Sequence, residues 1–277
     1  MKPRTARTHG ISRNTPTPLQ LRDEPCTDRI IPGISTRLAA LISDLFSVSD
    51  YPAGKLAEII RDVGFACDCC TKCCTKEFND HVFLLDKDTD VIKGIAPEAL
   101  IPAPCFELCD QNGKFYDSGY ALRTKPDGSC FFLERDRCRI YENRLSICRI
   151  YPYMLHREPD ADGIVDWRQI GGLNKHGSYH NEISVEESLA IAQEVKDYEI
   201  AFLEQTIRFY EFMCDYFTGH GLRNVRKIYD DRMQAFRKGE EIEVAVLYKG
   251  RLEPWRMKGD WAVPVTMNEG EDPGSAC

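Results

Sequence analysis

The stretch Phe65-Ala-Cys-Asp-Cys-Cys-Thr-Lys-Cys-Cys74 organises this chain, because it places five cysteines within eight positions. Four of them follow the pattern C-x2-C-x2-C-C. A disulfide needs Cα atoms roughly 4.4–6.8 Å apart and specific side-chain directions, so a run this dense offers few partners for pairing. Soft thiolates at two-residue spacing are instead typical ligands of zinc or of an iron–sulfur cluster. The stretch therefore predicts a metal site.

A second group of cysteines follows after residues 75–129, where Cys130, Cys138 and Cys148 occur within residues 128–153. The segment 138–153 predicts a helical turn and a loop that bring Cys138 and Cys148 together. Its end, Tyr151-Pro152-Tyr153, predicts a rigid turn that packs aromatic rings over the site and excludes water. A metal bound by both groups would close a long loop, so its binding free energy would become folding free energy for this region.

The two groups together resemble the cysteine-cluster family of zinc- or iron-chelating domains, which is named after its C-x2-C-x2-C-C signature. The later half of that family typically reads G-x-C-x-F-L, then C-x-I-Y, then an Arg-Pro pair, then C-R-x-Y/F-P-F. The matching residues here are Gly128, Cys130, Phe132, Leu133, Cys138, Ile140, Tyr141, Cys148, Arg149, Tyr151, Pro152 and Tyr153. The chain departs from the family at two places. Leu145 replaces the proline of the Arg-Pro pair, and residues 171–173 read Gly-Gly-Leu where many relatives have C-P-G, so the cysteine of that stretch is missing. The resemblance covers residues 60–175 and extends distantly to flagellin lysine N-methylases.

The resemblance implies metal binding by seven thiolates: Cys67, Cys70, Cys73, Cys74, Cys130, Cys138 and Cys148. One structural zinc uses four ligands and is then closed, which leaves three thiolates over. A cubane cluster also takes four cysteines, and its separated irons suit ligands from both groups. A 4Fe-4S cluster is therefore the first prediction, with zinc or mononuclear iron as alternatives, and the remaining thiols would hold a second metal or be redox-active. Adjacent Cys73 and Cys74 point apart in most backbone conformations, so we do not expect both to bind one mononuclear ion.

Four further residues are weaker candidates for metal ligands. Cys105 and Cys109 have x3 spacing, but the family motif does not use them. His176 and His180 stand four apart, which suits two ligands on one helix face, but the intervening 177–178 (Gly-Ser) makes a helix unfavourable there.

Composition narrows the possible functions. The chain has 277 residues and a formal net charge of −8, whereas a general nucleic-acid binder usually presents a basic face. No N-terminal apolar segment resembles a secretion signal, and no apolar run is long enough to span a bilayer. We therefore expect a cytoplasmic protein whose thirteen cysteines are reduced, so metal ligation is favoured over a disulfide framework.

Apolar periodicity predicts four helices. The first begins at residue 35, and the other three cover 52–63, 184–212 and 225–236. Ser35 or Thr36 is the expected cap of the first helix. Gly64 ends the second and delivers the chain into the cysteine run. Ser184-Val-Glu-Glu187 is a capping box for the third.

The remaining segments predict short strands and turns: a strand at 81–85, a polar turn at 86–90, a hairpin of 115–123 with 129–133, and a hairpin of 241–248 around 249–250. The expected fold class is mainly α, with an irregular cysteine-rich α+β metal-binding core and short β-hairpins. We expect a disordered arm at 1–30, a cysteine-cluster metal-binding domain at 31–180, C-terminal helices at 181–240, and a short hairpin with an acidic tail at 241–277.

Three functional classes fit these features. The first, which we favour, is a redox- or oxygen-responsive regulatory protein whose metal centre controls binding to a protein partner. The second is a metal-dependent enzyme such as a protein methyltransferase, although the sequence shows no S-adenosylmethionine loop, no C-x3-C-x2-C radical motif and no identifiable catalytic residue. The third is a structural zinc module that supports an interaction surface.

Overall fold

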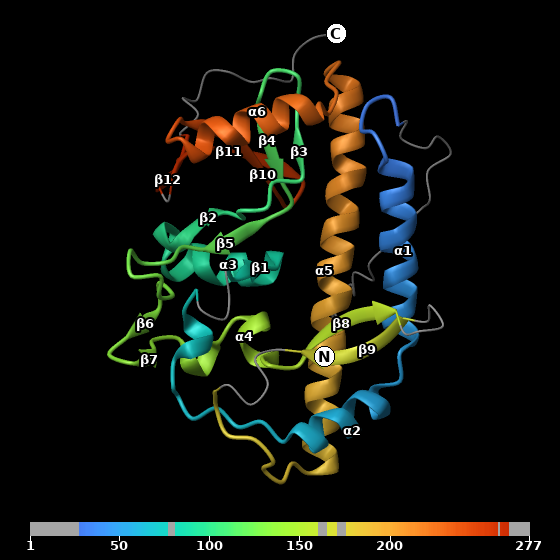
Figure 1. Ribbon diagram of the computed structural model, residues 1–277, viewed down its shortest axis with the longest axis vertical. Coiled ribbons are helices and arrows are strands. Elements are labelled where there is room, and N and C mark those ends of the chain that lie inside the picture. Colours follow the sequence, from blue (N-terminus) through green and yellow to red (C-terminus); the bar gives the residue numbers. More distant parts are fainter. Residues whose placement is uncertain (1–27, 77–80, 160–164, 171–175, 260, 266–277) are drawn as a thin grey trace, which may run out of the picture.

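The structure, a computed structural model, describes residues 28–76, 81–159, 165–170, 176–259 and 261–265 (Figure 1). Within these ranges the chain forms six α-helices and twelve short strands. The short sheets agree with the expected fold class. The label "mainly α" is not confirmed, because strands contribute a large part of the second of two apolar clusters that are described below. The acidic C-terminal end and all but 28–30 of the predicted N-terminal arm lie outside the described residues.

A helical layer forms around α5 (Val185–Gly219), with α1 (Ile34–Asp50) packed along it and α2 (Ala53–Val63) against its N-terminal part (Figure 1). The Ser184 Oγ accepts a hydrogen bond from the backbone N–H of Glu187 at 3.1 Å, which confirms the predicted cap of this helix. Its buried face then carries large apolar side chains. Because such a face must be covered, α1 and α2 pack onto it.

The two shorter helices of this layer begin and end largely as predicted. The cap of α1 differs, because Gly33 in the left-handed region precedes it and neither Ser35 nor Thr36 caps it. Gly64, at φ 54°, ends α2 as expected. A Cβ at that position would lie 2.4 Å from the carbonyl oxygen of Asn181, so only glycine permits this close approach.

A five-stranded sheet in the order β12-β11-β10-β4-β3 holds the C-terminal hairpin. Its strands are β3 (Leu108–Cys109), β4 (Phe115–Asp117), β10 (Ile242–Tyr248), β11 (Arg251–Lys258) and β12 (Trp261–Pro264). The predicted hairpin around 249–250 is confirmed, and β10 also pairs in parallel with β4, Val244 opposite Phe115. Helix α6 (Arg226–Arg237) packs against this sheet. Strand pairing thus joins the C-terminal segment to the cysteine-rich segment.

A smaller sheet in the order β1-β5-β2 lies beside α3 (Asp86–Ile95). Its strands are β1 (Phe83–Leu84), β2 (Leu100–Pro102) and β5 (Tyr120–Leu122). Two sequence predictions were wrong here. The polar turn at 86–90 is instead the start of α3, where Asp86 and Asp88 favour the positive end of the helix dipole. The strand predicted at 115–123 breaks at Gly119, and its two parts belong to two different sheets. A Cβ at Gly119 would lie 2.9 Å from the Phe83 ring, so the backbone approaches this ring too closely for a side chain.

The remaining elements are short, and three of them, η1, β7 and α4, carry cysteines. They are the 3-10 helices η1 (Lys72–Cys74), η2 (Pro97–Ala99) and η3 (Tyr141–Asn143), the helix α4 (Ser146–Ile150), and the strand pairs β6 (Leu133–Glu134) with β7 (Arg137–Cys138) and β8 (Met154–Pro159) with β9 (Val165–Ile170). The helical turn and loop predicted at 138–153 are confirmed by η3 and α4.

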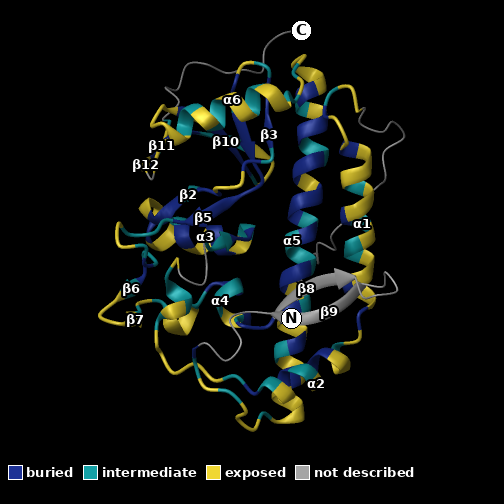
Figure 2. Ribbon diagram, viewed as in Figure 1, coloured by how far each residue is buried: buried dark blue, intermediate teal, exposed yellow. Residues whose placement is uncertain are grey.

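The buried apolar residues divide into two clusters (Figure 2). The first lies between α5, α1 and α2, with Phe209, Met213 and Phe217 fully buried. The second lies between the two sheets, α3 and α6, and the half-buried cysteines of the second group pack against it. The helices α1, α2 and α5 therefore pack mainly on the first cluster, which also takes in Tyr116, Ala245 and Ile150, whereas the cysteines of the second group border the second cluster. Within the part of the chain that the structure describes, no helix combines the length and apolar character needed to cross a bilayer.

Two buried carboxyl groups lie together between these layers. Glu107 accepts hydrogen bonds from both the backbone N–H and the hydroxyl of Ser118. Asp117 is fully buried, and among the described residues neither of its carboxyl oxygens has a hydrogen-bond partner. Burial raises the pKa of Glu107 to about 7, and burial together with the neighbouring Glu107 charge raises the pKa of Asp117 well above its usual range. The pair is therefore stable only when it holds a proton.

This pair predicts a pH-dependent stability. The unfolded chain releases the Glu107 proton near pH 4.5, whereas the folded chain keeps it to about pH 7, and the pKa of Asp117 shifts in the same direction. The free energy of unfolding should therefore fall as pH rises across that window, by about 1.4 kcal/mol per pH unit for each retained proton. Asp117→Asn removes one titrating group and should flatten this slope, measured by urea unfolding at several pH values. Asp50→Asn, at an exposed position, is the control. Equal slopes in wild type and Asp117→Asn would contradict this account.

Candidate metal centre

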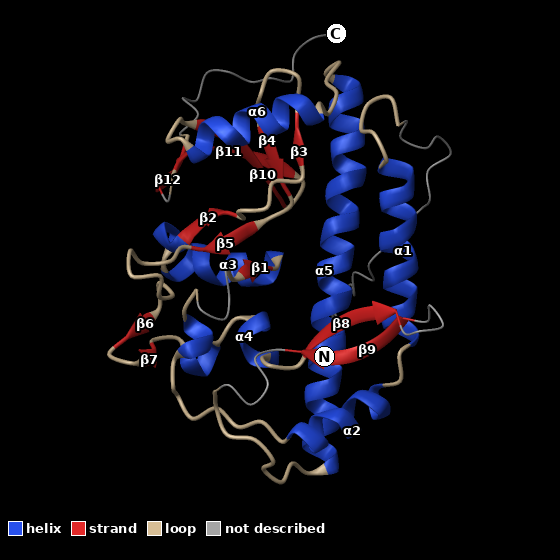
Figure 3. Ribbon diagram, viewed as in Figure 1, coloured by secondary structure: helices blue, strands red, loops and turns tan. Residues whose placement is uncertain are grey.

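The first cysteine group leaves α2 through Gly64 and runs mostly as a loop to η1 (Figure 3). Three of its thiols are exposed, at Cys67, Cys69 and Cys70. The tight turn of η1 then places the last two, Cys73 and Cys74, in half-buried positions. A short turn after an extended segment thus directs only the end of the motif toward the protein interior.

Backbone hydrogen bonds fasten the end of the first group to the start of the second. The N–H of Cys130 donates to the carbonyl of Cys74 at 2.7 Å, and the N–H of Lys76 donates to the carbonyl of Gly128 at 3.1 Å. The turn that precedes Cys130 is closed by the Asp127 carboxylate, which accepts from the N–H and hydroxyl of Ser129. The two groups, distant in sequence, therefore meet in space, as the sequence predicted.

The other two cysteines of the second group come from separate short elements. Cys138 ends β7, where it pairs with Leu133 of β6. Cys148 lies on α4, whose first residue, Ser146, donates from both its N–H and its hydroxyl to the buried carboxylate of Asp88, at 3.0 and 2.9 Å. Asp88 therefore fixes the start of the helix that carries Cys148, a role that the sequence pattern did not indicate.

One small cavity, of about 30 Å³, lies where these elements meet. Four thiols and an imidazole are among the side chains that line it: Cys73, Cys74, Cys130, Cys148 and His81. Thiolates and imidazole are the donor set that zinc and iron prefer in proteins, so the chemistry of this lining suits such a metal. Sequence reasoning did not identify His81, because it lies outside both cysteine motifs.

Electrostatics joins Cys138 to this group and shows what the group needs. Burial, with smaller contributions from the nearby Cys74 and Cys138, raises the pKa of the Cys130 thiol to about 11. Burial is the largest cause that raises the pKa of Cys148, and the neighbouring Cys130, Cys74 and Cys138 raise it as well. Four thiols whose ionisation is mutually opposed need a nearby cation to become thiolates together. Cys74, Cys130, Cys138 and Cys148 are hereafter called the thiol tetrad.

Cys73 and Cys74 do not point apart. Their Sγ atoms lie 4.0 Å apart, because η1 turns both side chains toward the same cavity. The premise of divergent side chains is therefore wrong, whereas the expectation that the pair does not bind one mononuclear ion stays a prediction. That expectation assumed a typical extended or helical backbone, whereas Thr71 in the left-handed region starts a tight 3-10 turn here.

The exposed thiols form a second neighbourhood beside the tetrad. The N–H of Cys70 donates to the Asp68 carboxylate at 3.0 Å, and the charge of Cys67 raises the pKa of Cys69. Cys67 and Cys69 also act on the pKa of Tyr141. The predicted ligation by Cys67 and Cys70 stays a prediction, since these side chains are exposed and do not line the tetrad cavity.

An aromatic cluster covers the start of the cysteine run, as predicted from Tyr151-Pro152-Tyr153. The centre of the Phe65 ring lies 6.3 Å from that of Tyr151 and 6.5 Å from that of Tyr153. The backbone N–H of Phe65 donates to the Tyr153 hydroxyl at 2.9 Å. The buried His176 joins this cluster, with its Nε2 2.7 Å from the Tyr151 hydroxyl oxygen. These rings pack against one another beside the start of the cysteine run, and the predicted exclusion of water from the site stays a prediction.

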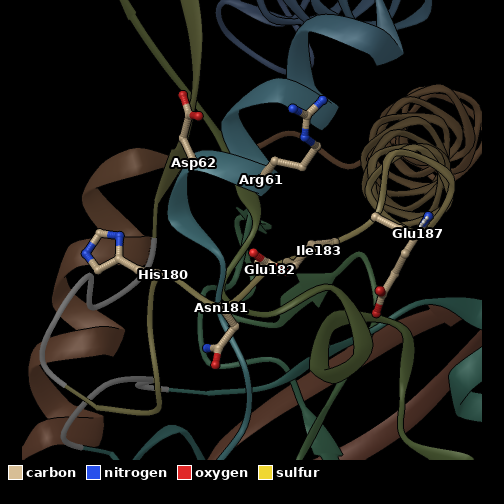
Figure 4. A pocket seen from close by; sticks show the side chains of 8 residues that line it. Arg61, Asp62, His180, Asn181, Glu182, Ile183 and Glu187 are labelled. Atoms are coloured by element: carbon tan, nitrogen blue, oxygen red, sulfur yellow. Dashed lines mark hydrogen bonds between the residues drawn. The ribbon is translucent and has the colours of Figure 1, made fainter.

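The weaker candidates lie elsewhere. Cys105 is exposed, and Cys109 is buried on β3, where burial raises the pKa of its thiol to about 12. His180 is exposed and lines a different, open groove at the N-terminal end of α5, together with Arg61 and Glu187 (Figure 4). Cys214, buried on α5, is disulfide-bonded, which departs from the expectation that every cysteine is reduced. None of these residues lines the tetrad cavity.

The cavity is not a finished coordination sphere. In the described ranges, no three His, Cys, Asp or Glu side chains already stand in an arrangement that holds a metal ion.

Comparison with known proteins agrees with this site. Residues 66–176 match the model of the CxxCxxCC family, described as "Putative zinc- or iron-chelating domain". The cysteines at positions 67, 69, 70, 73 and 74 fit its motif. Neither the curated proteins nor the solved structures contain a match to the chain. Residues 66–176 of this chain are therefore similar to the CxxCxxCC family of zinc- or iron-chelating domains.

Proposed function

We propose that the chain binds a metal centre at the thiol tetrad and uses it as a redox- or oxygen-responsive switch that controls affinity for a protein partner. The observation that carries this proposal is that Cys74, Cys130 and Cys148, from three separate segments, line one cavity, and that Cys138 lies close enough to raise the pKa of Cys130 and Cys148. Thiols gathered in this way destabilise one another when ionised, and a bound cation reverses the sign of that interaction.

A 4Fe-4S cluster is the first candidate for the centre. It takes four cysteine ligands, the number in the tetrad, and it is suited to ligands that come from separate segments. When bound, such a cluster supplies one-electron chemistry. The chain would contribute the surroundings. The pKa of Cys74 is raised mainly by Cys73, and the pKa values of Cys130 and Cys138 are raised mainly by burial. Nearby cations oppose part of each rise and so favour the thiolate forms: Arg144 for Cys74 and Cys138, and Lys125 for Cys130.

Zinc is the second candidate, and one distance favours it. Two sulfurs of a tetrahedral zinc site with Zn–S bonds of about 2.3 Å lie about 3.8 Å apart. The Sγ atoms of Cys73 and Cys74 already lie 4.0 Å apart. A zinc held by this pair with Cys130 and Cys148 would give a colourless structural module.

The switch itself is supported by the position of the site. The exposed thiols Cys67, Cys69 and Cys70 lie on the surface next to the tetrad, where oxidants and a partner have access. We place this function in the cytoplasm, where thiols remain reduced; the disulfide at Cys214 is the observation that weighs against that location.

Metal analysis with an absorption spectrum tests the centre. Anaerobically purified protein should be brown, with broad visible absorption and several iron and sulfide per chain. Cys130→Ser and Cys148→Ser should each lose most of the metal, because each removes a tetrad ligand. Cys105→Ser, at an exposed position outside the cavity, should keep it. Colourless protein with one zinc and no iron would contradict the iron–sulfur cluster and favour zinc. If both Ser variants kept their full metal content, the thiol tetrad would be excluded as the metal site.

Hydrogen exchange tests the switch. Because the metal joins two distant cysteine groups, its loss in air should weaken protection across 65–76 and 81–153. The helices α5 and α1 pack mainly on the first apolar cluster and should keep their protection. The comparison is between anaerobic and air-treated samples of the full chain. Identical protection in the cysteine segments of both samples would rule the switch out.

A further inference from the structure

The side chain of His81 lines the tetrad cavity, yet it belongs to neither cysteine motif. It is half-buried and enters the cavity wall beside Cys73, Cys74 and Cys130. We propose that the His81 imidazole is a nitrogen ligand of the metal bound there, so that the coordination sphere is mixed sulfur and nitrogen instead of all thiolate. This inference rests on the proposed metal centre and adds a ligand to it.

The backbone around His81 is fixed by the same frame that joins the cysteine groups. The carbonyl of Val82, the next residue, accepts a hydrogen bond from the N–H of Leu122 at 3.0 Å. Two residues beyond Leu122, Thr124 bridges to Cys130, whose N–H donates to the carbonyl of Cys74. Three neighbouring backbone segments therefore carry His81, Cys130 and Cys74, and none can shift far without breaking these bonds.

The chemistry of the cavity favours a neutral donor at this position. Each thiolate that binds a metal adds a negative charge to this cavity, whose four lining thiols are all half-buried. A neutral imidazole donates an electron pair without adding charge, and it is an ordinary ligand of zinc and iron. In iron–sulfur centres, replacing thiolate by imidazole raises the reduction potential. A His81 ligand would therefore make the centre easier to reduce than an all-cysteine site.

Two other histidines were the predicted candidates, and the structure places both differently. His176 directs its Nε2 at the Tyr151 hydroxyl within the aromatic cluster. His180 is exposed on the groove at the N-terminal end of α5. Neither lines the tetrad cavity. Substitutions of these two histidines serve as matched controls for His81, because each substitution removes one imidazole that does not line the tetrad cavity.

The test uses Co²⁺ as the probe metal, added anaerobically to the metal-free full-length protein. Thiolate ligation gives a sulfur-to-cobalt charge-transfer band, and a coordinated histidine gives a hyperfine-shifted, solvent-exchangeable ring N–H proton in the NMR spectrum. We expect both signals in wild type. His81→Ala should keep the charge-transfer band, lose the shifted ring proton and bind Co²⁺ at least about tenfold more weakly. His176→Ala and His180→Ala should keep both signals.

The outcomes separate this inference from the proposed function. A charge-transfer band without any shifted ring proton, or a ring proton that disappears in His176→Ala instead of His81→Ala, would overturn the His81 assignment and leave the thiol centre standing. Absence of the band in wild type would overturn the centre itself. His81→Cys guards against a folding defect, because it should restore Co²⁺ affinity and strengthen the charge-transfer band while the ring proton stays absent.

Discussion

The hydrogen bond from the Cys130 N–H to the Cys74 carbonyl is the contact on which the cysteine-rich half of this molecule depends. It joins two segments that are separated by residues 75–129, and the loops on either side have little regular structure to hold them together otherwise. With that bond in place, the turn before Cys130 and the 3-10 turn η1 aim their thiols at one cavity. The helical layer around α5 packs mainly on the first apolar cluster, whereas the cysteines of the second group border the second.

Gathering thiols in this way creates an electrostatic problem that a metal solves. In the absence of a cation, burial and mutual repulsion keep the tetrad protonated, as the raised pKa values of Cys130 and Cys148 indicate. A bound metal supplies the missing charge, and in exchange the thiolates tie together elements that otherwise meet through a few backbone bonds. Asp88 and His81 belong to the same design, the first by fixing the helix that carries Cys148 and the second by lining the cavity.

The sequence predicted those features that depend on local pattern. The helix from Ser184, the glycine stop at Gly64 and the hairpin around 249–250 each follow from residues close together in the chain. The missed features depend on tertiary contacts: the parallel pairing of β10 with β4, the helix that replaces the polar turn at 86–90, and the orientation of Cys73 relative to Cys74. His81 escaped notice for the same reason, because its place in the cavity is decided by its neighbour's bond to β5, which no motif records.

The central claim is that metal bound to this chain is held mainly by cysteine sulfur at the meeting point of the two groups. X-ray absorption at the metal edge of the anaerobically purified full-length protein tests it most directly, because it reports the ligand atoms whichever metal is present. The account predicts a first shell dominated by sulfur at about 2.3 Å, with a minor nitrogen contribution at about 2.0–2.1 Å. A first shell of oxygen and nitrogen without sulfur would contradict it.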